Sequence, residues 1–197
     1  MNTKYTCYHG TNSESAQNII KTKVFKCSTG TKEWAGEGVY FFINWTDGEA
    51  NASANALKWA KMRWSKKPHI PEVLKVEFEA DADRIFDLTN PQMQEEFHKF
   101  RNKYFIHMKR RLRELGTPGS IPLTKIPDAG ELDCTIINRI CKSMDYCAVI
   151  KRCYINFEGN IKELRIKLPI SFIPNCTILA LRNQELISEI EVYRDET

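Results

Sequence analysis

The chain has 197 residues, of which 42% are apolar and 27% charged, a composition that excludes a wholly disordered protein. Its longest strongly apolar run, residues 39–43, is far shorter than the roughly 20 residues of a membrane span. The net charge is +4, and the whole excess lies in residues 91–130, which carry 8 basic and 4 acidic side chains. We therefore expect a cytoplasmic protein without a secretory signal or membrane contact, with a modest attraction for phosphate groups in its middle segment.

The cysteines and histidines give no sign of a metal site. There are seven cysteines, an odd number, and no two of them have C-x-x-C spacing. Neither a disulfide framework nor a zinc site fits this pattern. The four histidines are also too scattered along the chain to suggest a metal cluster. We expect reduced, partly buried thiols and no bound metal.

Hydrophobic periodicity divides the chain into short strands and amphipathic helices. Apolar residues recurring every three or four positions indicate helices, and alternation of apolar with polar residues indicates half-buried strands. The first strand is expected to end at the turn His9-Gly10-Thr11, and Asn12 or Ser13 can cap the first helix. The expected elements, in chain order, are strand 5–8, helix 14–22, strand 39–42, helix 50–64, strand 73–79, helix 91–115, helix 132–144, and strands 146–157, 161–168, 176–182 and 186–193. This order predicts an α+β fold, in a single domain over residues 1–197.

The longest expected helix, over residues 91–115, is both amphipathic and basic. Between Phe97 and Arg113 it carries seven Lys or Arg and no acid. Its other face is an apolar and aromatic stripe, made of Met93, Phe97, Phe100, Tyr104, Met108, Leu112 and Leu115. A packed stripe with a solvated basic face is the ordinary outcome for such a helix. The alternative is a phosphate-tracking surface, for which the candidate nucleic-acid-binding residues are Arg110, Arg111 and Arg113. A Gly- and Pro-rich loop follows, so residues 91–130 are expected to form an insertion.

Common catalytic motifs are missing from the sequence. It contains no G-x-x-x-x-G-K-[ST], no G-x-G-x-x-G after a strand, no H-E-x-x-H and no G-x-S-x-G. This excludes the P-loop, dinucleotide-binding, metalloprotease and hydrolase sites that these motifs build. Two short segments remain as candidates, Tyr8-His9-Gly10-Thr11 and residues 36–42, which read G-E-G-V-Y-F-F.

Together these two segments resemble the ADP-ribosyltransferase superfamily, in its diphtheria-toxin-like and PARP-like branch. That branch typically has Y-H-G-T, a helix, G-x-G-[VI]-Y-F about thirty residues later, and then a helix with alanine and an aromatic residue. The last of these looks like residues 56–60 here, and residues 132–138 are similar to an L-D-C-x-x-I-N segment of bacterial single-domain members. The resemblance implies an ADP-ribosyltransferase-like fold, in which two small antiparallel sheets form an NAD cleft with flanking helices.

The resemblance also implies roles for individual residues around NAD as the co-substrate. His9, supported by Tyr8 and Thr11, would hold the adenosine ribose hydroxyls, a contact that an uncharged imidazole can make. Gly10 would offer its backbone to the nicotinamide amide, where a side chain would block the approach. Tyr40 would stack on the nicotinamide ring through its flat face. The implied NAD-binding set is Tyr8, His9, Gly10, Thr11, Gly38, Tyr40 and Ile178.

The catalytic glutamate of the branch has no counterpart at the matching position. It begins a late strand, and the best match here, residues 178–183, puts Ile178 in its place. Isoleucine can neither stabilise an oxocarbenium-like transition state nor activate a hydroxyl group. Members with a non-acidic residue there resemble mono-ADP-ribosyltransferases or inactive relatives. Either the substrate assists, or an acid from elsewhere serves; we expect Glu158, in an F-x-E-G-like segment, with the alternatives Glu163, Glu185 and Glu189.

The function that the resemblance implies is mono-ADP-ribosylation of a macromolecule, either a nucleic acid such as RNA or a protein, with His9, Tyr40 and Glu158 as catalytic residues. Such a domain looks like a toxin of a toxin–antitoxin or anti-phage system, for which a neutralising antitoxin protein is an expected partner. Two alternatives stay open. One is an NAD glycohydrolase, with water as the acceptor. The other is an NAD- or ADP-ribose-binding module without catalysis, which Ile178 favours.

Overall fold

The computed structural model describes residues 2–45, 52–64, 69–114, 127–157, 171 and 173–194. Its strands are β1 (Asn2–Asn12), β2 (Val39–Ile43), β3 (Pro71–Asp81), β4 (Ile85–Asp87), β5 (Ala148–Cys153), β6 (Cys176–Leu181) and β7 (Ile187–Val192). Its helices are α1 (Ser13–Thr22), α2 (Ala52–Arg63), α3 (Pro91–Glu114) and α4 (Ala129–Met144), with the 3-10 helices η1 (Ala82–Arg84) and η4 (Gln184–Leu186). The α+β class expected from the sequence is confirmed.

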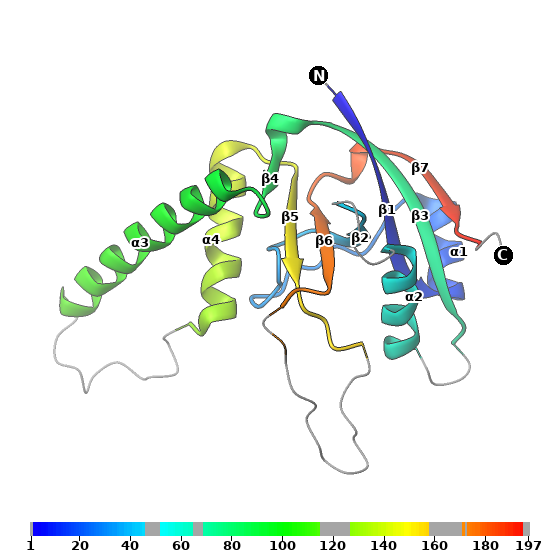
Figure 1. The fold of residues 1–197 in the computed structure, drawn as a ribbon, viewed down its shortest axis with the longest axis horizontal. Helices are drawn as coiled ribbons and strands as arrows, with labels where there is room; N and C mark the ends of the chain where they lie inside the picture. The colour runs from blue at the N-terminus through cyan, green and yellow to red at the C-terminus, as the bar shows by residue number, and fades with distance from the viewer. Residues whose placement is uncertain are drawn as a thin grey trace, which may run out of the picture.

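The strands of the described residues form one mixed sheet, in the order β4-β5-β6-β2-β1-β3-β7 (Figure 1). All neighbours are antiparallel except β4 and β5. A single residue pair, Tyr8 opposite Phe42, joins β1 to β2, whereas β1 pairs with β3 along its whole length. The expectation of two separate antiparallel sheets is therefore wrong, because the pairing at Tyr8 continues from one half-sheet into the other. The narrow joint divides the sheet into the half-sheets β4-β5-β6-β2 and β1-β3-β7.

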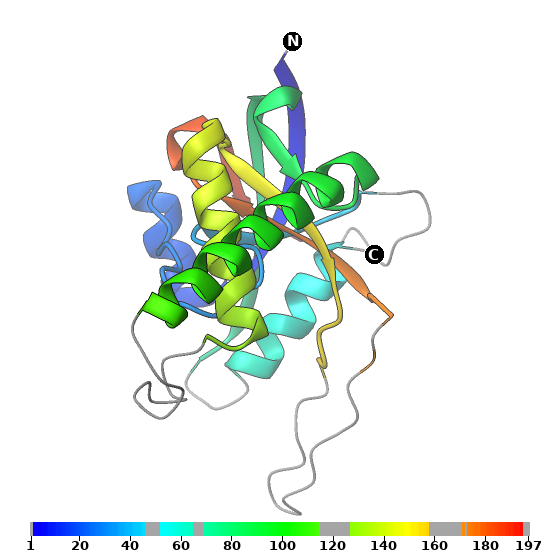
Figure 2. The ribbon, with the colours of Figure 1, turned by 90° about the vertical axis from the view of Figure 1, so that its left-hand side faces the viewer.

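Each face of the sheet has its own hydrophobic core, because successive side chains of a strand point to opposite faces. On β2, Phe41 lies in the first core and Phe42 in the second. Helix α1 covers the first core with Ala16 and Ile19, whereas α2, α3 and α4 cover the second. Figure 2 shows α3 crossing over α4 on that second face. Full burial of a side chain such as Phe41, 1% exposed, contributes about 1.5–3 kcal/mol to folding.

The helix starts follow local signals in the sequence. The side-chain oxygen of Asn12 accepts a hydrogen bond from the Ser15 backbone N–H at 2.9 Å, which makes Asn12 the N-cap of α1, as predicted. Helix α4 starts with a capping box, in which Asp128 and Glu131 each bond the other's backbone N–H. This capping box moves the start of α4 from the expected residue 132 to Ala129.

Several strand bounds differ from the prediction, and two of these differences, at β1 and β4, concern how the sheet is paired. β1 continues through His9-Gly10-Thr11 instead of ending there, because residues up to Asn12 stay paired with β3. The pattern did not indicate β4, since its three residues are too few to show alternation; it is held by parallel pairing with Ala148–Ile150 of β5. The expected strand 161–168 and residues 115–126 lie outside the described residues.

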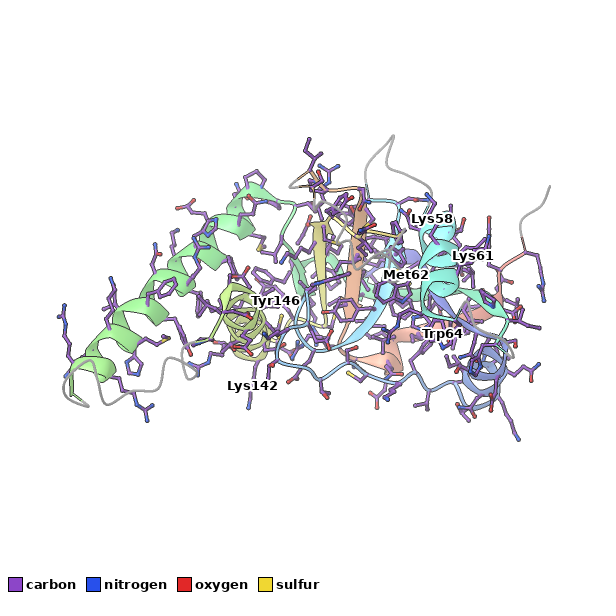
Figure 3. All side chains as sticks on the ribbon, turned by 90° about the horizontal axis from the view of Figure 1, so that it is seen from below. Lys58, Lys61, Met62, Trp64, Lys142 and Tyr146 are labelled. Atoms are coloured by element: carbon purple, nitrogen blue, oxygen red, sulfur yellow. The ribbon has the colours of Figure 1, made fainter. Side chains whose placement is uncertain are left out.

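The packing of helix α3 on the body of the protein reaches from its start to Tyr104. Phe97 is buried, and Met93, Phe100 and Tyr104 are packed against the second core. Farther along the helix, the side chain of Ile106 is 69% exposed. Figure 3 shows the side chains of the part of α3 beyond Tyr104 projecting outward, with no other described helix or strand beside them. The predicted stripe is thus a packing surface at one end of the helix only.

Two expectations concern reduced, partly buried cysteines and the lack of a membrane-spanning helix. All seven cysteines are free thiols and five of them are buried, as expected from their number and spacing. In the part of the chain that the structure describes, no helix combines the length and the apolar character that crossing a membrane requires.

Candidate functional site

A cavity of about 220 Å³, here called the main cavity, lies beside the joint between β1 and β2. Its wall is formed by residues from both half-sheets, from α2 and from the segments before β2 and after β5: His9, Gly10, Lys26, Ser28, Glu33, Trp34, Tyr40, Phe41, Phe42, Trp59, Ile155 and Ile178. Four residues that the resemblance implied, separated by up to 169 positions, therefore line one cavity: His9, Gly10, Tyr40 and Ile178.

His9 is fixed by a hydrogen bond between its ring and the backbone of β2. Its Nδ1 lies 2.8 Å from the carbonyl oxygen of Tyr40. Because a carbonyl oxygen only accepts, Nδ1 carries the proton, and Nε2 is left as an acceptor. The edge-to-face contacts with Phe25 and Phe41, at 5.2 and 5.7 Å, hold the ring orientation. Burial lowers the pKa of His9, which outweighs the opposing effect of the bond to Tyr40, so the imidazole is neutral at pH 7.

Tyr40 is held as a rigid flat wall of the main cavity. Its hydroxyl donates a hydrogen bond to the Gly36 carbonyl at 2.7 Å and accepts one from the Ala35 N–H at 2.8 Å. Burial raises the pKa of Tyr40, so the phenol stays protonated. Because the hydroxyl bonds the preceding loop in both directions, what Tyr40 offers a ligand is the face of its ring.

Gly10 lets helix α2 approach the strand closely. A Cβ atom at this position would lie 2.1 Å from the Ala56 carbonyl oxygen, a distance that no side chain tolerates. Gly10 therefore has a packing role as well as a place in the cavity wall, and any larger residue would push α2 away from β1.

The segment before β2 is anchored by Asn138 of α4. The Asn138 side-chain oxygen accepts hydrogen bonds from the Glu37 N–H and from Arg182, both at 2.8 Å. Gly36 has φ +76°, and a Cβ there would lie 2.5 Å from the same oxygen. The 132–138 segment thus holds the loop that carries Tyr40's hydrogen-bond partners.

Three other residues of the implied NAD-binding set lie outside the cavity wall in the described structure. The ring of Tyr8 contacts Tyr193 edge-to-face at 5.2 Å, and Thr11 is buried. The backbone N–H and C=O of Gly38 are both bonded to Ser28, at 3.1 and 2.9 Å. Gly38 acts through Ser28, which does line the main cavity.

The candidate acids and the basic residues are not brought together at this site. Glu158 and Glu163 lie outside the described residues. Glu185 is in η4 and Glu189 is in β7, at the far edge of the sheet. The three candidate arginines, Arg110, Arg111 and Arg113, lie at the distal end of α3, which projects away from β1 and β2 (Figure 1).

Several wall residues were not predicted as site residues, and Glu33 is one of them. It provides the one carboxylate among the described residues of the main-cavity wall, and its charge helps to raise the pKa of Tyr40. Beside it, Trp34 packs edge-to-face on Trp59 at 6.0 Å. The sequence contained one signal, since Trp34 is an aromatic residue just before the G-x-G turn, and the structure leaves it 42% exposed.

The wall combines flat apolar surfaces with a few polar groups, which is the usual make-up of a small-molecule site. Its volume is below the roughly 300–1,000 Å³ of sites that enclose a whole drug-sized ligand, so it would enclose only part of a dinucleotide. The Nε2 acceptor of His9 suits a hydroxyl group, the ring of Tyr40 suits a planar heterocycle, and Lys26 suits a phosphate. No group of three His, Cys, Asp or Glu in the described ranges is arranged to hold a metal ion.

Comparison with known proteins adds no function to this site. No family model and no solved structure match the chain. The chain is similar to an uncharacterized protein of Methanocaldococcus jannaschii, with 30% identity over 89 residues that cover 44% of this chain. The match spans 38% of the length of that relative.

Proposed function

We propose that the protein is a mono-ADP-ribosyltransferase, which transfers ADP-ribose from NAD to a macromolecular acceptor. One observation carries the proposal: His9 and Tyr40, 31 positions apart, are joined by a 2.8 Å hydrogen bond and open onto one cavity with Gly10 and Ile178. These are the residues whose pattern resembles the ADP-ribosyltransferase superfamily.

Three groups of the main-cavity wall suit three parts of NAD. The nicotinamide ring would stack on Tyr40, whose two backbone hydrogen bonds prevent it from turning aside. A hydroxyl of the adenosine ribose would donate to Nε2 of His9, which is neutral and therefore able to accept. Lys26, also in the wall, would meet the diphosphate.

The reaction needs a negative charge near the ribose. The bond between C1′ and the nicotinamide nitrogen breaks, nicotinamide leaves with the electron pair, and the acceptor's nucleophile bonds C1′ and releases its proton. Positive charge develops on the ribose in between, and a nearby carboxylate stabilises it. Ile178, 2% exposed, cannot do so. Glu33 is the carboxylate that we assign to this role, in place of Glu158.

The isoleucine at position 178 argues for a second candidate function. Because an isoleucine stands where the branch has its glutamate, an NAD- or ADP-ribose-binding module without catalysis would have the same wall. An NAD glycohydrolase would differ only in using water as the acceptor. In the transferase case the setting that the resemblance suggests is a toxin with a neutralising protein partner.

The test is incubation of the purified protein with NAD labelled on its adenylate phosphate and with a cell extract, afterwards separated into RNA, DNA and protein. Label retained on one fraction establishes the transferase and its acceptor class. Consumption of NAD without retained label points to the glycohydrolase, and intact NAD that still binds in calorimetry points to the module.

Three variants connect the result to the site. Tyr40→Ala removes the stacking surface and should abolish retained label, whereas Tyr40→Phe keeps the ring and should retain part of it. His9→Ala should also abolish it. Near-normal labelling by both alanine variants, with the fold intact by circular dichroism, would refute the assignment of this cavity.

A further inference from the structure

A second cavity, of about 340 Å³ and here called the side cavity, lies between α3, α4 and β5. Its wall is basic. It includes Arg101 and His98 from α3 and Lys151 and Arg152 from β5. Asp133 of α4 supplies the one carboxylate among its described lining residues. Such a hollow attracts an anionic group.

Arg101 gives a sharper indication of the ligand. Its Nε atom is buried and has no hydrogen-bond partner among the residues that the structure describes. The guanidinium group lies over the ring of Phe97, 5.9 Å from the ring centre, within the range of a cation–π contact. A buried donor without an acceptor is unfavourable, and phosphate oxygens match the planar fork of an arginine.

The side cavity adjoins the main cavity. Lys151 lines the side cavity, and its Nζ donates a hydrogen bond to the backbone oxygen of Trp34, which lines the main cavity, at 3.0 Å. On the sheet, Lys151 is also the direct partner of Ile178 in the β5–β6 register. A ligand in the side cavity would therefore lie next to the site of the proposed reaction.

The basic character continues outward along α3. Exposed lysines and arginines follow Arg101 toward the free end of the helix: Lys103, Lys109, Arg110, Arg111 and Arg113. Phe105 and Ile106, 39% and 69% exposed, lie among them. Cations that follow a backbone and aromatic side chains on which bases stack are the two features of single-strand binding, and Phe105 supplies such a ring. An acidic protein partner would not need the aromatic surface.

We propose that the side cavity binds a backbone phosphate of a single-stranded nucleic-acid acceptor, with the strand running along α3. This inference rests on the proposed function, because it identifies the acceptor of the same site. The nucleotide next to the bound phosphate would reach the main cavity past Lys151.

The experiment measures binding of a fluorescein-labelled single-stranded RNA of roughly 12 nucleotides by anisotropy, with no NAD present. Arg101→Gln should raise the Kd about tenfold and reduce the slope of log Kd against log salt concentration by about one. The matched control is Lys99→Gln, which removes the same charge two residues away, on a side chain already paired with Glu95 and Glu96. The control should change the Kd less than about twofold.

Two further measurements separate the outcomes. Arg101→Lys keeps the charge but loses the fork, so it should recover only part of the affinity if the protein is folded. Equal Kd values for Arg101→Gln and Lys99→Gln would overturn the proposal. So would an Arg101→Gln variant that binds RNA normally but has lost binding to an acidic peptide. NAD consumption is followed separately in the wild type. If NAD stays intact while Arg101→Gln still loses RNA binding, the proposed reaction fails and the nucleic-acid site stands.

Discussion

The two cavities are built in different ways. The main cavity takes most of its polar groups from strands and the loop before β2, and two of its side chains are held by hydrogen bonds: His9 bonds Tyr40, and Tyr40 bonds the loop in both directions. The side cavity lies between α3, α4 and β5, and Arg101 has a buried donor without a described partner. The wall of the main cavity combines aromatic faces with a few polar and charged groups, whereas the wall of the side cavity is mainly basic. Substitutions should therefore affect chemistry in one cavity and salt-sensitive affinity in the other.

The largest expected effect is that of Glu33→Gln in the main cavity. Loss of the carboxylate should lower kcat for NAD turnover about 100- to 1,000-fold, because it removes charge stabilisation of the transition state. The Kd for NAD should change little, since the shape of the wall is kept. Quenched-flow or chromatographic measurement of nicotinamide release gives kcat, and calorimetry gives the Kd.

The matched control for this prediction is Glu37→Gln. Glu37 lies four residues farther along the same segment, and its carboxylate faces Arg182, 3.7 Å away, outside the main-cavity wall. It should keep kcat within about threefold, as expected for an exposed charge. Equal turnover by the Glu33 variant and the wild type would transfer the role to Glu158.

A smaller loss is expected for Tyr40→Phe, which tests whether the main cavity depends on rigidity. The ring stays, but the bonds to Ala35 and Gly36 are lost. Two buried backbone groups are left without their partner, at a cost of about 1–3 kcal/mol each. We expect kcat/KM to fall about tenfold, less than for Tyr40→Ala. A loss as large as that of the alanine variant would mean that the hydroxyl group, rather than the ring, acts on the substrate.

Glycine substitutions test the loop before β2, which holds Tyr40 in the wall of the main cavity. Gly36→Ala places a Cβ 2.5 Å from Asn138 at φ +76°, so we expect it to lower the free energy of unfolding by about 1–3 kcal/mol. The control, Gly130→Ala, lies in the first turn of α4 with its nearest neighbour at 3.4 Å. It should stabilise by up to about 1 kcal/mol through helix propensity. Urea denaturation measures both, and a neutral Gly36→Ala would show that the loop can move.

How much of this could be predicted from the sequence depended on spacing along the chain. His9 and Tyr40 lie in two short segments with a recognisable pattern, and strand alternation fixed which face each side chain occupies. Glu33 and Trp34 lie in an irregular segment, where no periodicity identifies a cavity wall. The side cavity depends on Arg101 and Lys151, 50 positions apart, and their neighbourhood follows only from the crossing of α3 and α4 over β5.

The smallest expected effect concerns the charge state of His9 in the main cavity. Burial lowers its pKa below the ordinary value of 6.5, so below that pH the unfolded chain binds a proton that the folded protein resists. The contribution of neutral His9 to the free energy of unfolding is therefore complete above pH 6.5. It is lost as the pH falls from 6.5 through the lowered pKa. His9→Asn should make the free energy of unfolding decrease less steeply between pH 7 and pH 5, measured by urea denaturation. Identical slopes would show that His9 is solvated and able to charge, which would remove the reason for assigning a neutral acceptor to the main cavity.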